Sequence, residues 1–440
     1  MFFLLNLLQT VNGFFWNGPL LLFLLFTHIC FTFRTGFVQR KLPTALRLSV
    51  SSQNDNTQGK KSRSLGAFTA LATTLAATLG TGNIIGLSTA IALGGPGAVF
   101  WCWMTGFLGM ATSYTECFLS LKFREQRPDK SFLGGPMYLL KNQLHIPKAA
   151  RFYAYLLLLS AFCVGCSAQS RAVTETLDTL FDLPAFPTGL CLALVITVIL
   201  LGGLTGIGTV CSFLVPVMGG FFLLSCIFLL FFLRNHLADA LNLILTSAFS
   251  LSSVSGGLLG SSLLLSARQG IARGLFTNEA GLGSAPVAAA NSIGSSKEQA
   301  LVLMSATFWD TVVMCGMTGL VIVCAGLAVP DLFEGFTAGD YTLAAFSLLP
   351  FAGEKILGIA IVLFAAATLL GWCFFGEKAV EFLFGAEQIT YYRFLYCLMV
   401  FLGSQMNMSL IWELSDFFNG MMFVTNVICL FLLRKEIERP

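Results

Sequence analysis

Charged side chains are scarce in this sequence, at 11% of its 440 residues. A soluble globular protein carries about 25% charged residues, so this shortage excludes that class. Hydrophobic residues make up 56% of the chain, and its mean hydropathy is +0.81. These values are typical of an integral membrane protein that crosses the bilayer many times, and we expect one membrane domain.

Histidine is nearly absent, and the three histidines, His28, His145 and His236, are far apart in the sequence. This distribution offers no spacing for a zinc site. No nucleophile–base pair or metal cluster is recognisable at membrane depth, which argues against a membrane-embedded enzyme. We therefore expect no organic cofactor, no enzymatic activity and no nucleic-acid partner.

A disulfide framework is also lacking among the 13 cysteines. Their number is odd and they are scattered singly through apolar segments. Cys163 and Cys166 form a C-x-x-C sequence, but inside an apolar helix. We interpret the cysteines as small buried hydrophobic side chains rather than redox or metal-binding groups.

Long hydrophobic runs dominate what the sequence does contain. A membrane-spanning helix needs about 20 apolar residues, and about eleven segments meet that length. The segments lie near 16–33, 66–92, 96–121, 152–180, 187–203, 208–233, 256–292, 299–326, 354–376, 390–407 and 410–433. The first lacks a basic region before it, so we expect a retained helix rather than a cleaved signal peptide.

Basic residues indicate how these segments are oriented. The loops 34–63 and 122–151 are rich in Lys and Arg, which places them in the cytoplasm. The loop after residue 326 carries acids without a base and falls outside by the same alternation. The sequence therefore predicts an N-terminus outside, a cytoplasmic C-terminus and a multi-pass location in the plasma (inner) membrane.

Two of the long segments are interrupted, at Gly80–Asn83 and at Asn278–Gly283. Each interruption opens a group of five helices, so the second group would run opposite to the first, as an inverted repeat. The predicted fold is all-α, with one N-terminal helix, a five-plus-five inverted repeat and two discontinuous helices. Its parts are an extra helix (1–38), a basic cytoplasmic linker (39–64), two repeats (65–235 and 236–433) and a cytoplasmic tail (434–440).

The first interruption reads Gly80-Thr81-Gly82-Asn83. Unpaired peptide groups cost several kcal/mol each in hydrocarbon, so unwound backbone persists only where it lines a cavity or meets a ligand. Free N–H groups where the helix resumes favour a substrate carboxylate, and the preceding carbonyls suit a hard cation such as Na⁺. Taken alone, these glycines are better explained as a helix-packing face, because small residues are common at membrane helix interfaces.

The second interruption, Asn278-Glu279-Ala280-Gly281-Leu282-Gly283, changes that balance. Paired breaks in two halves of a membrane protein indicate the central binding site of a secondary transporter. Glu279 is ionisable at membrane depth, which usually marks a functional residue. Glu279 would either contact a cation or cap the unwound ends of the broken helices, and we favour capping.

Other polar residues fall inside predicted spans. Gln169 would contact an amino-acid zwitterion or bond to a neighbouring helix, and the two readings are even. Thr368 offers a hydroxyl, but threonine is tolerated in such helices, and without other support we favour a structural role. Trp372 would either wall a small pocket or fill the core of the bundle. Asp310 indicates a structural network, and Glu116 is expected to reach the cytoplasmic interface.

Charges of both signs gather near the predicted outer side. Arg268 and Arg273 precede the second interruption, and Glu413 and Asp416 begin the last helix. Opposite charges at these positions would form an external gate.

Several motifs resemble the alanine/glycine:sodium symporter family. The matching stretches are Ala76–Gly86, Gly94–Ala98, Gly134–Tyr138, Arg273–Ser284, which is the most specific, and Gly371-Trp372 with Gly376-Glu377. The resemblance covers nearly the whole chain. It departs at Cys166 and Arg171, where the family typically has Asn.

This resemblance implies a fold similar to LeuT-type symporters and cotransport of Na⁺ with a small neutral amino acid, usually alanine or glycine. By matching position, the implied substrate contacts are Thr81, Gly82, Asn83, Gln169, Phe276, Gly281 and Trp372. The implied sodium ligands are carbonyls near Ala76, Leu79 and Ala365 and the hydroxyl of Thr368. Proton coupling or amino-acid exchange on the same fold, or a sensor that binds without transport, remain the alternatives.

Overall fold

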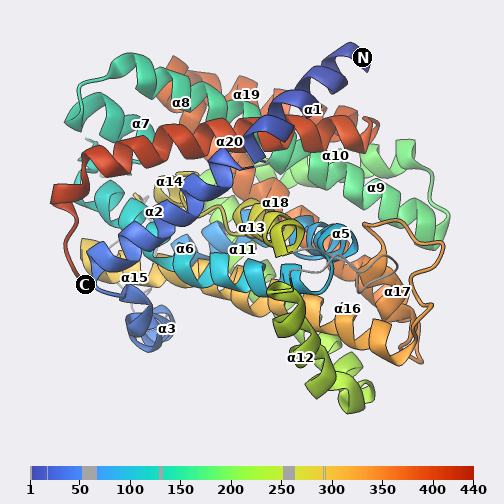
Figure 1. Ribbon diagram of the computed structural model, residues 1–440. Helices are drawn as coiled ribbons and strands as arrows, with labels where there is room; N and C mark the ends of the chain where they lie inside the picture. The colour runs from blue at the N-terminus through green and yellow to red at the C-terminus, as the bar shows by residue number, and fades with distance from the viewer. Residues whose placement is uncertain are drawn as a thin grey trace.

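The computed structural model describes residues 2–16, 18–51, 67–127, 132–250, 263–290, 292 and 294–440. Helices dominate this part of the chain (Figure 1). In it, the one strand pairing joins β1 (Glu125–Gln126) to β2 (Phe132–Leu133) in an antiparallel hairpin.

The N-terminal half contains α1 (Phe2–Trp16), α2 (Pro19–Thr35), η1 (Val38–Lys41), α3 (Leu42–Ser51), α4 (Ala67–Thr78), η3 (Thr81–Asn83), α5 (Ile85–Gly94), α6 (Gly97–Lys122), α7 (Pro136–Tyr138), η4 (Leu139–Gln143), α8 (Pro147–Ser160), η5 (Ala161–Ser167), α9 (Ala168–Phe181), α10 (Ala185–Leu201) and α11 (Gly203–Phe232).

The C-terminal half contains η6 (Arg234–His236), α12 (Leu237–Ala248), α13 (Leu263–Asn278), α14 (Ala285–Ala289), α15 (Ser296–Thr307), η8 (Phe308–Cys315), α16 (Gly316–Ala328), α17 (Tyr341–Ser347), α18 (Gly353–Phe384), η9 (Ala386–Gln388), α19 (Ile389–Ser404), α20 (Met408–Leu432) and η10 (Arg434–Glu436).

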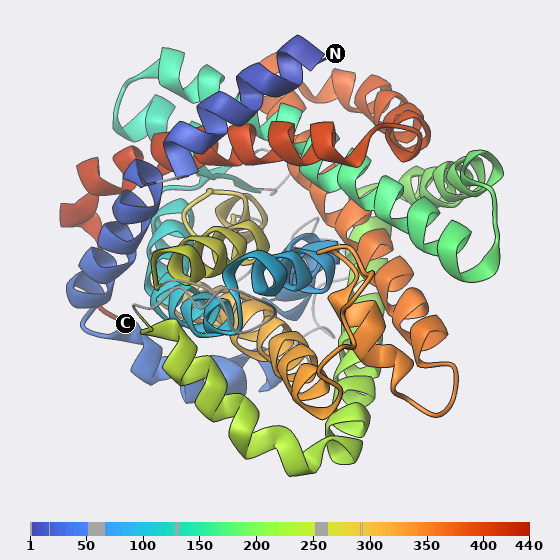
Figure 2. The same ribbon diagram turned by 45° about the vertical axis from the view of Figure 1, so that its right-hand side comes forward.

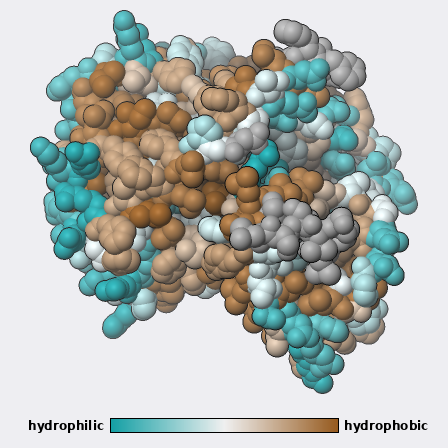
Figure 3. All heavy atoms as spheres, in the orientation of Figure 1, coloured by the Kyte–Doolittle hydropathy of each residue, from teal (hydrophilic) through white to brown (hydrophobic). Residues whose placement is uncertain are grey.

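The helices form a membrane domain. Among the described residues, five continuous helices are long and apolar enough to cross a membrane, and two bent helix pairs raise that number to seven. The predicted count of about eleven spans includes further helices that are shorter or less apolar. On the face drawn in Figure 3, hydrophobic residues occupy most of the middle, and hydrophilic residues gather toward the two sides of the view.

Five α-helices were not predicted from the sequence. They are α1, α3, α7, α12 and α17. Helix α3 occupies part of the basic segment expected to be a linker, and it packs on α15. Residues 52–66 of that linker lie outside the described part of the chain. Helix α12 buries Ala240, Ile244 and Ala248, an i, i+4, i+8 stripe too short to register as a span.

The first predicted interruption is present between α4 and α5. The two helical parts meet at 60° across Leu79 and Gly80. A Cβ atom built on Gly371 of α18 would lie 2.6 Å from the backbone nitrogen of Ala77. A real Cβ atom could not lie so close, so a glycine at this position allows α18 to pack directly against the end of α4.

The second predicted interruption lies between α13 and α14. Glu279, Gly281 and Gly283 have φ values of 55°, 94° and 86°. A left-handed glutamate is uncommon, and such strain collects where the surrounding structure holds it in place. The backbone then resumes as α14, which has a proline in its first turn.

The two broken helices lie side by side at the centre of the bundle. Helix α13 contacts both η3 and α5, and the two views show α5 and α13 together inside a ring of other helices (Figures 1 and 2). The fold is therefore the all-α inverted-repeat arrangement with two discontinuous helices that the sequence predicts.

Candidate functional site

The first break presents backbone donors beside Gln169. The Thr81 N–H donates to Gln169 Oε1 at 3.2 Å, and the Thr81 hydroxyl donates to the same oxygen at 3.1 Å. Among the described contacts, the next N–H, that of Gly82, has no acceptor. A donor at the positive end of α5 is suited to a substrate carboxylate.

A π-helical segment, η5, sets the direction of Gln169. The Gln169 Nε2 donates to Val164 O, inside η5, at 3.3 Å. This bond holds the amide so that its oxygen faces Thr81. Single π-helical turns often mark functional positions, although nothing in the apolar sequence of η5 predicted one.

The second break presents acceptors. Helix α13 ends at Asn278, and the Ala280 N–H donates to Asn278 Oδ1 at 2.9 Å instead of to a carbonyl of the last helical turn. As a result, the carbonyls of Phe276 and Thr277 accept no hydrogen bond among the described residues. Such carbonyls are suited to an ammonium group, so the two breaks together offer both halves of a zwitterion site.

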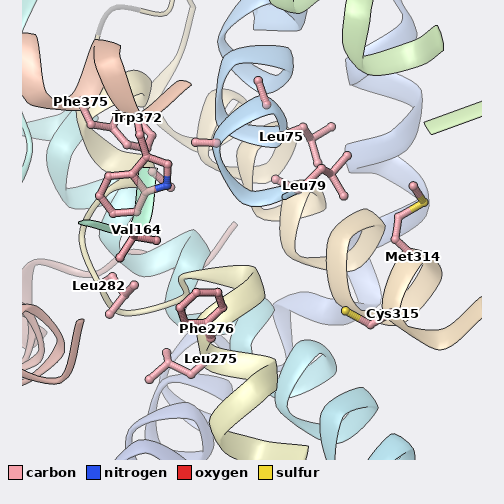
Figure 4. Close-up of a cluster of buried hydrophobic side chains, with 14 of the residues drawn as sticks. Leu75, Leu79, Val164, Leu275, Phe276, Leu282, Met314, Cys315, Trp372 and Phe375 are labelled. Carbon is pink, nitrogen blue, oxygen red and sulfur yellow. The ribbon is translucent and has the colours of Figure 1, made fainter. Parts of the chain in front are cut away.

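Two aromatic side chains predicted to contact the substrate lie near the breaks. A Cβ atom on Gly82 would lie 3.1 Å from the ring of Phe276, so this ring packs on the unwound backbone. The Trp372 side chain is fully buried and lies beside Val164 and Leu282 (Figure 4). Contact of these two rings with a substrate stays a prediction.

The residues implied for sodium also meet. The Thr368 hydroxyl lies 3.0 Å from Ala76 O and 3.3 Å from Leu79 O, at the end of α4. A Cβ on Gly80 would lie 2.9 Å from the same hydroxyl, so this hydroxyl lies directly against the unwound backbone. Ala365 is buried one turn earlier on α18. Carbonyl and hydroxyl oxygens are the ligands that a hard cation prefers.

Asn83 faces a different partner. Its Nδ2 donates to Asp310 Oδ1 at 2.6 Å and to Asp310 O at 3.1 Å, while its own Oδ1 has no partner among the described residues. Asp310 lies in the π-helical segment η8 and also accepts from Thr311 at 2.8 Å. The structural network expected at Asp310 is present, and it includes Asn83.

Glu116 corrects one expectation from the sequence. Instead of reaching the cytoplasmic interface it is 1% exposed, and its Oε2 accepts from Asn426 at 2.9 Å. The same Asn426 nitrogen donates to Gly281 O, so Glu116 is tied to the unwound segment. Its other carboxylate oxygen has no partner among the described residues. Glu279 accepts a hydrogen bond from Ser284, which directly precedes α14, and its capping role stays a prediction. The sequence signal was a buried acid on α6, which proximity to Lys122 obscured.

Gly281 lies on that same side of the break. Its carbonyl accepts from Asn426 at 2.9 Å, and a Cβ atom on it would lie 2.8 Å from the ring of Phe423. Its contacts are therefore with α6 and α20, while Thr81 bonds to α9. Substrate contact by Gly281 stays a prediction.

The outer charges line one cavity without pairing. Arg273, Arg268, Glu413 and Asp416 all face it, yet in the described residues neither arginine lies within 4.0 Å of a carboxylate oxygen. Instead the Arg273 guanidinium lies 4.9 Å from the Trp412 ring, which is 4.8 Å from the Phe276 ring. The predicted gating role of these residues stays a prediction.

Cys166 and Arg171, the two positions that depart from the family pattern, face away from the first break. Cys166 Sγ lies 3.7 Å from Tyr396 O, and Arg171 donates to Ser404 O at 3.3 Å. Both acceptors belong to α19, whereas Gln169 between them faces Thr81. Both departures therefore lie on the face that packs on α19.

A second cavity, of about 300 Å³, lies next to the central site. Its lining includes Ile84, Thr89, Glu175 and Trp412 from α5, α9 and α20. Ile84 directly follows Asn83, so this cavity lies beside the first break.

Comparison with known proteins identifies relatives of this chain. A family model described as the sodium:alanine symporter family matches residues 1–439. The chain is 40% identical to the sodium/alanine symporter AgcS of Methanococcus maripaludis, over 97% of this chain and 94% of that protein. It is 32% identical to the probable sodium/glutamine symporter GlnT of Bacillus subtilis, over 98% and 89%.

Solved structures include a similar fold. A Na⁺-coupled sialic acid symporter in a substrate-bound outward-open state matches with a TM-score of 0.58. The match covers 94% of this chain and 88% of that one, at 11% sequence identity. At that identity the likeness concerns the fold alone.

Proposed function

The chain belongs to the sodium:alanine symporter family, and we propose that it carries alanine or glycine with Na⁺ by alternating access. Membership makes it a Na⁺-coupled amino-acid transporter and not an enzyme. The observation that carries the proposed substrate is the meeting of the two breaks. The free N–H of Gly82 and the free carbonyls of Phe276 and Thr277 complement the two charged ends of an amino acid.

Substrate size is supported by the aromatic walls. Phe276 packs on Gly82, and Trp372 is fully buried against Gly165 of η5. A longer side chain would have to displace one of these rings. The proposed substrates are therefore alanine and glycine, and the described contacts offer no polar group dedicated to a substrate side chain.

Coupling follows from the proximity of the two sites. The Na⁺ ligands at the end of α4 and the carboxylate donors at η3 are separated by one residue, Gly80. A bound cation stabilises the nearby carboxylate, so ion and substrate raise each other's affinity by the same factor. An inside-negative potential then adds about 2.3 kcal/mol per 100 mV for each positive charge carried inward.

Reconstituted uptake tests the proposal. Proteoliposomes containing the full chain receive radiolabelled alanine, glycine or glutamine with an inward sodium gradient, with a pH gradient, or with neither. We expect alanine or glycine uptake that needs the sodium gradient. Uptake that follows the pH gradient without sodium would favour proton coupling, and uptake only against internal amino acid would favour exchange. Binding without uptake would identify a sensor.

Glutamine is included because one relative bears that name. Saturable glutamine uptake with little alanine uptake would overturn the proposed substrate while leaving sodium coupling intact.

The orientation is part of the proposal. We propose an outer N-terminus and a cytoplasmic C-terminus because the basic loops 34–63 and 122–151 share one side with the C-terminal tail. Lys122 contacts Glu436 and Glu438 of that tail, which agrees with one location for both. Labelling of single introduced cysteines in intact cells tests this assignment.

A further inference from the structure

A polar cavity of about 280 Å³ lies between the N-terminal segment and helices of the second repeat. Helix α1, which precedes the extra N-terminal helix α2, forms one wall, and α13 and α20 form the others. The groups that bear on its chemistry are Asn12, Trp16, Arg268, Arg273, Glu413 and Asp416.

The positive and the negative side chains of this cavity lie on different walls. Helix α13 contributes two guanidinium groups, and α20 contributes two carboxylates. Among the described residues no ion pair joins them, and neither Arg268 nor Asp416 has a side-chain hydrogen bond. Opposite charges that face one another without contact leave space for a ligand that carries both signs.

Helix α1 adds two polar groups without partners. The Asn12 side chain donates to Glu413 Oε2 at 2.6 Å, but its Oδ1 has no partner among the described residues. Trp16 Nε1 likewise has none. Both residues are more than nine-tenths buried, at 6% and 8% exposure. Leaving a buried polar atom without a partner is unfavourable, so a ligand that bonds to these atoms would be stabilised.

We propose that this cavity is a second, outer binding site for a small zwitterionic amino acid. Its carboxylate would face Arg268 and Arg273, and its ammonium group would face Glu413 and Asp416. The volume exceeds what alanine or glycine needs, and the mixed charges disfavour a simple cation or anion.

Arg273 links this site to the central one. Its guanidinium stacks on Trp412 at 4.9 Å and lies 5.8 Å from the ring centre of Phe276. Phe276 in turn packs on Gly82. A carboxylate that draws Arg273 into the outer cavity loosens the stack over the central site, so occupancy of the two sites is coupled.

This inference takes its ligand from the proposed function, and the test separates the two. Purified full-length protein is saturated with radiolabelled L-alanine in sodium buffer, and bound alanine per chain is measured. We expect about two per chain in the unaltered protein. Gly82→Leu fills the central site and should leave the outer one. Glu413→Gln with Asp416→Asn should lower binding toward one per chain, and all three changes together should abolish it.

Two further variants distinguish loss of the outer site from misfolding of the protein. Arg268→Gln alters the opposite wall and should weaken the same outer site while both carboxylates remain. Glu334→Gln removes an exposed loop carboxylate outside the cavity and should leave binding unchanged. Circular dichroism and size-exclusion profiles confirm that each variant is folded.

The outcomes are distinct. One alanine per chain, lost entirely in Gly82→Leu, overturns the outer site and leaves the proposed function standing. One alanine per chain that is retained in Gly82→Leu but lost in the variant with Glu413→Gln and Asp416→Asn supports the outer site and counts against the central one. Absence of alanine binding in the unaltered protein counts against both.

Discussion

Asn426 Nδ2 donates to Glu116 Oε2 at 2.9 Å and, from the same nitrogen, to Gly281 O at 2.9 Å. One amide on α20 thus ties a buried carboxylate on α6 to the unwound segment of the second broken helix. Tyr153 on α8 donates to Leu282 O at 2.8 Å, one residue further along. The second break is therefore held open by side chains from three helices that surround it.

Replacing Glu116 by Ala should destabilise the protein. The Nδ2 group of Asn426 would lose one of its two acceptors at a buried position, at a cost of about 1–3 kcal/mol. We expect a lower thermal unfolding midpoint and reduced uptake, measured on purified protein and in proteoliposomes. Glu116→Gln retains an acceptor and should lose less. An Ala variant as stable as Glu334→Gln would contradict the role of Glu116 beside the second break.

Replacing Gln169 by Ala should weaken substrate affinity. Thr81 would lose the acceptor of its N–H and its hydroxyl. One or two hydrogen bonds correspond to about 1.4 kcal/mol, which is about a tenfold rise in KM for alanine uptake. Ser170→Ala is the matched control, because Ser170 bonds to Ser167 O on its own helix. An unchanged KM in the Gln169 variant would remove Gln169 from the site.

Replacing Thr368 by Ala should lower sodium affinity. The variant lacks the hydroxyl between Ala76 O and Leu79 O, whereas Thr368→Ser keeps it. We expect the sodium concentration for half-maximal uptake to rise severalfold in the Ala variant only. Because the linkage is reciprocal, the KM for alanine should rise with it. Equal sodium curves for Ala and Ser would place the ion elsewhere.

Replacing Gly82 by Ala should select the smaller substrate. The added methyl group would lie 3.1 Å from Phe276, so that ring must shift by a few tenths of an ångström. Alanine uptake should fall more than glycine uptake, because the ring shifts toward the substrate side chain. Gly220→Ala is the control, since nothing lies within 4 Å of its Cβ position. An equal loss for both substrates would argue that Phe276 is not the wall.

The C-terminal tail should detach on acidification. Hydrogen bonds from Lys122 and Lys297 lower the pKa of Glu438 below its usual value of 4.5. A lowered pKa means that this contact stabilises the fold above about pH 4.5 and is lost as the pH falls through the lower folded pKa. Glu438→Gln should therefore reduce the difference in unfolding midpoint between pH 7 and pH 4. A pH dependence identical to that of the unaltered chain would show that the tail contributes nothing.

Local chemistry in the sequence determined the class of the protein and its two breaks. Scarce charge and long apolar runs require a membrane, and Gly80, Gly82, Gly281 and Gly283 mark backbone that cannot continue as a regular helix there. Gln169 and Thr368 were recognisable as polar groups inside spans, and their oxygens do lie beside the unwound ends of α4 and η3. These features depend on neighbouring positions in the sequence and on the requirements of the bilayer. They can therefore be recognised from a single sequence.

Tertiary structure alone decided which group meets which. Glu116 and Asn426 are separated by 310 positions, and no local pattern predicts that they form a hydrogen bond beside the second break. The same holds for Cys166 and Arg171, whose direction toward α19 depends on how that helix packs. Helix α1 and the charges on α13 and α20 enclose a cavity only because α20, near the end of the chain, packs on α1, at its beginning. Long-range packing sets these distances, and a linear pattern carries no measure of them.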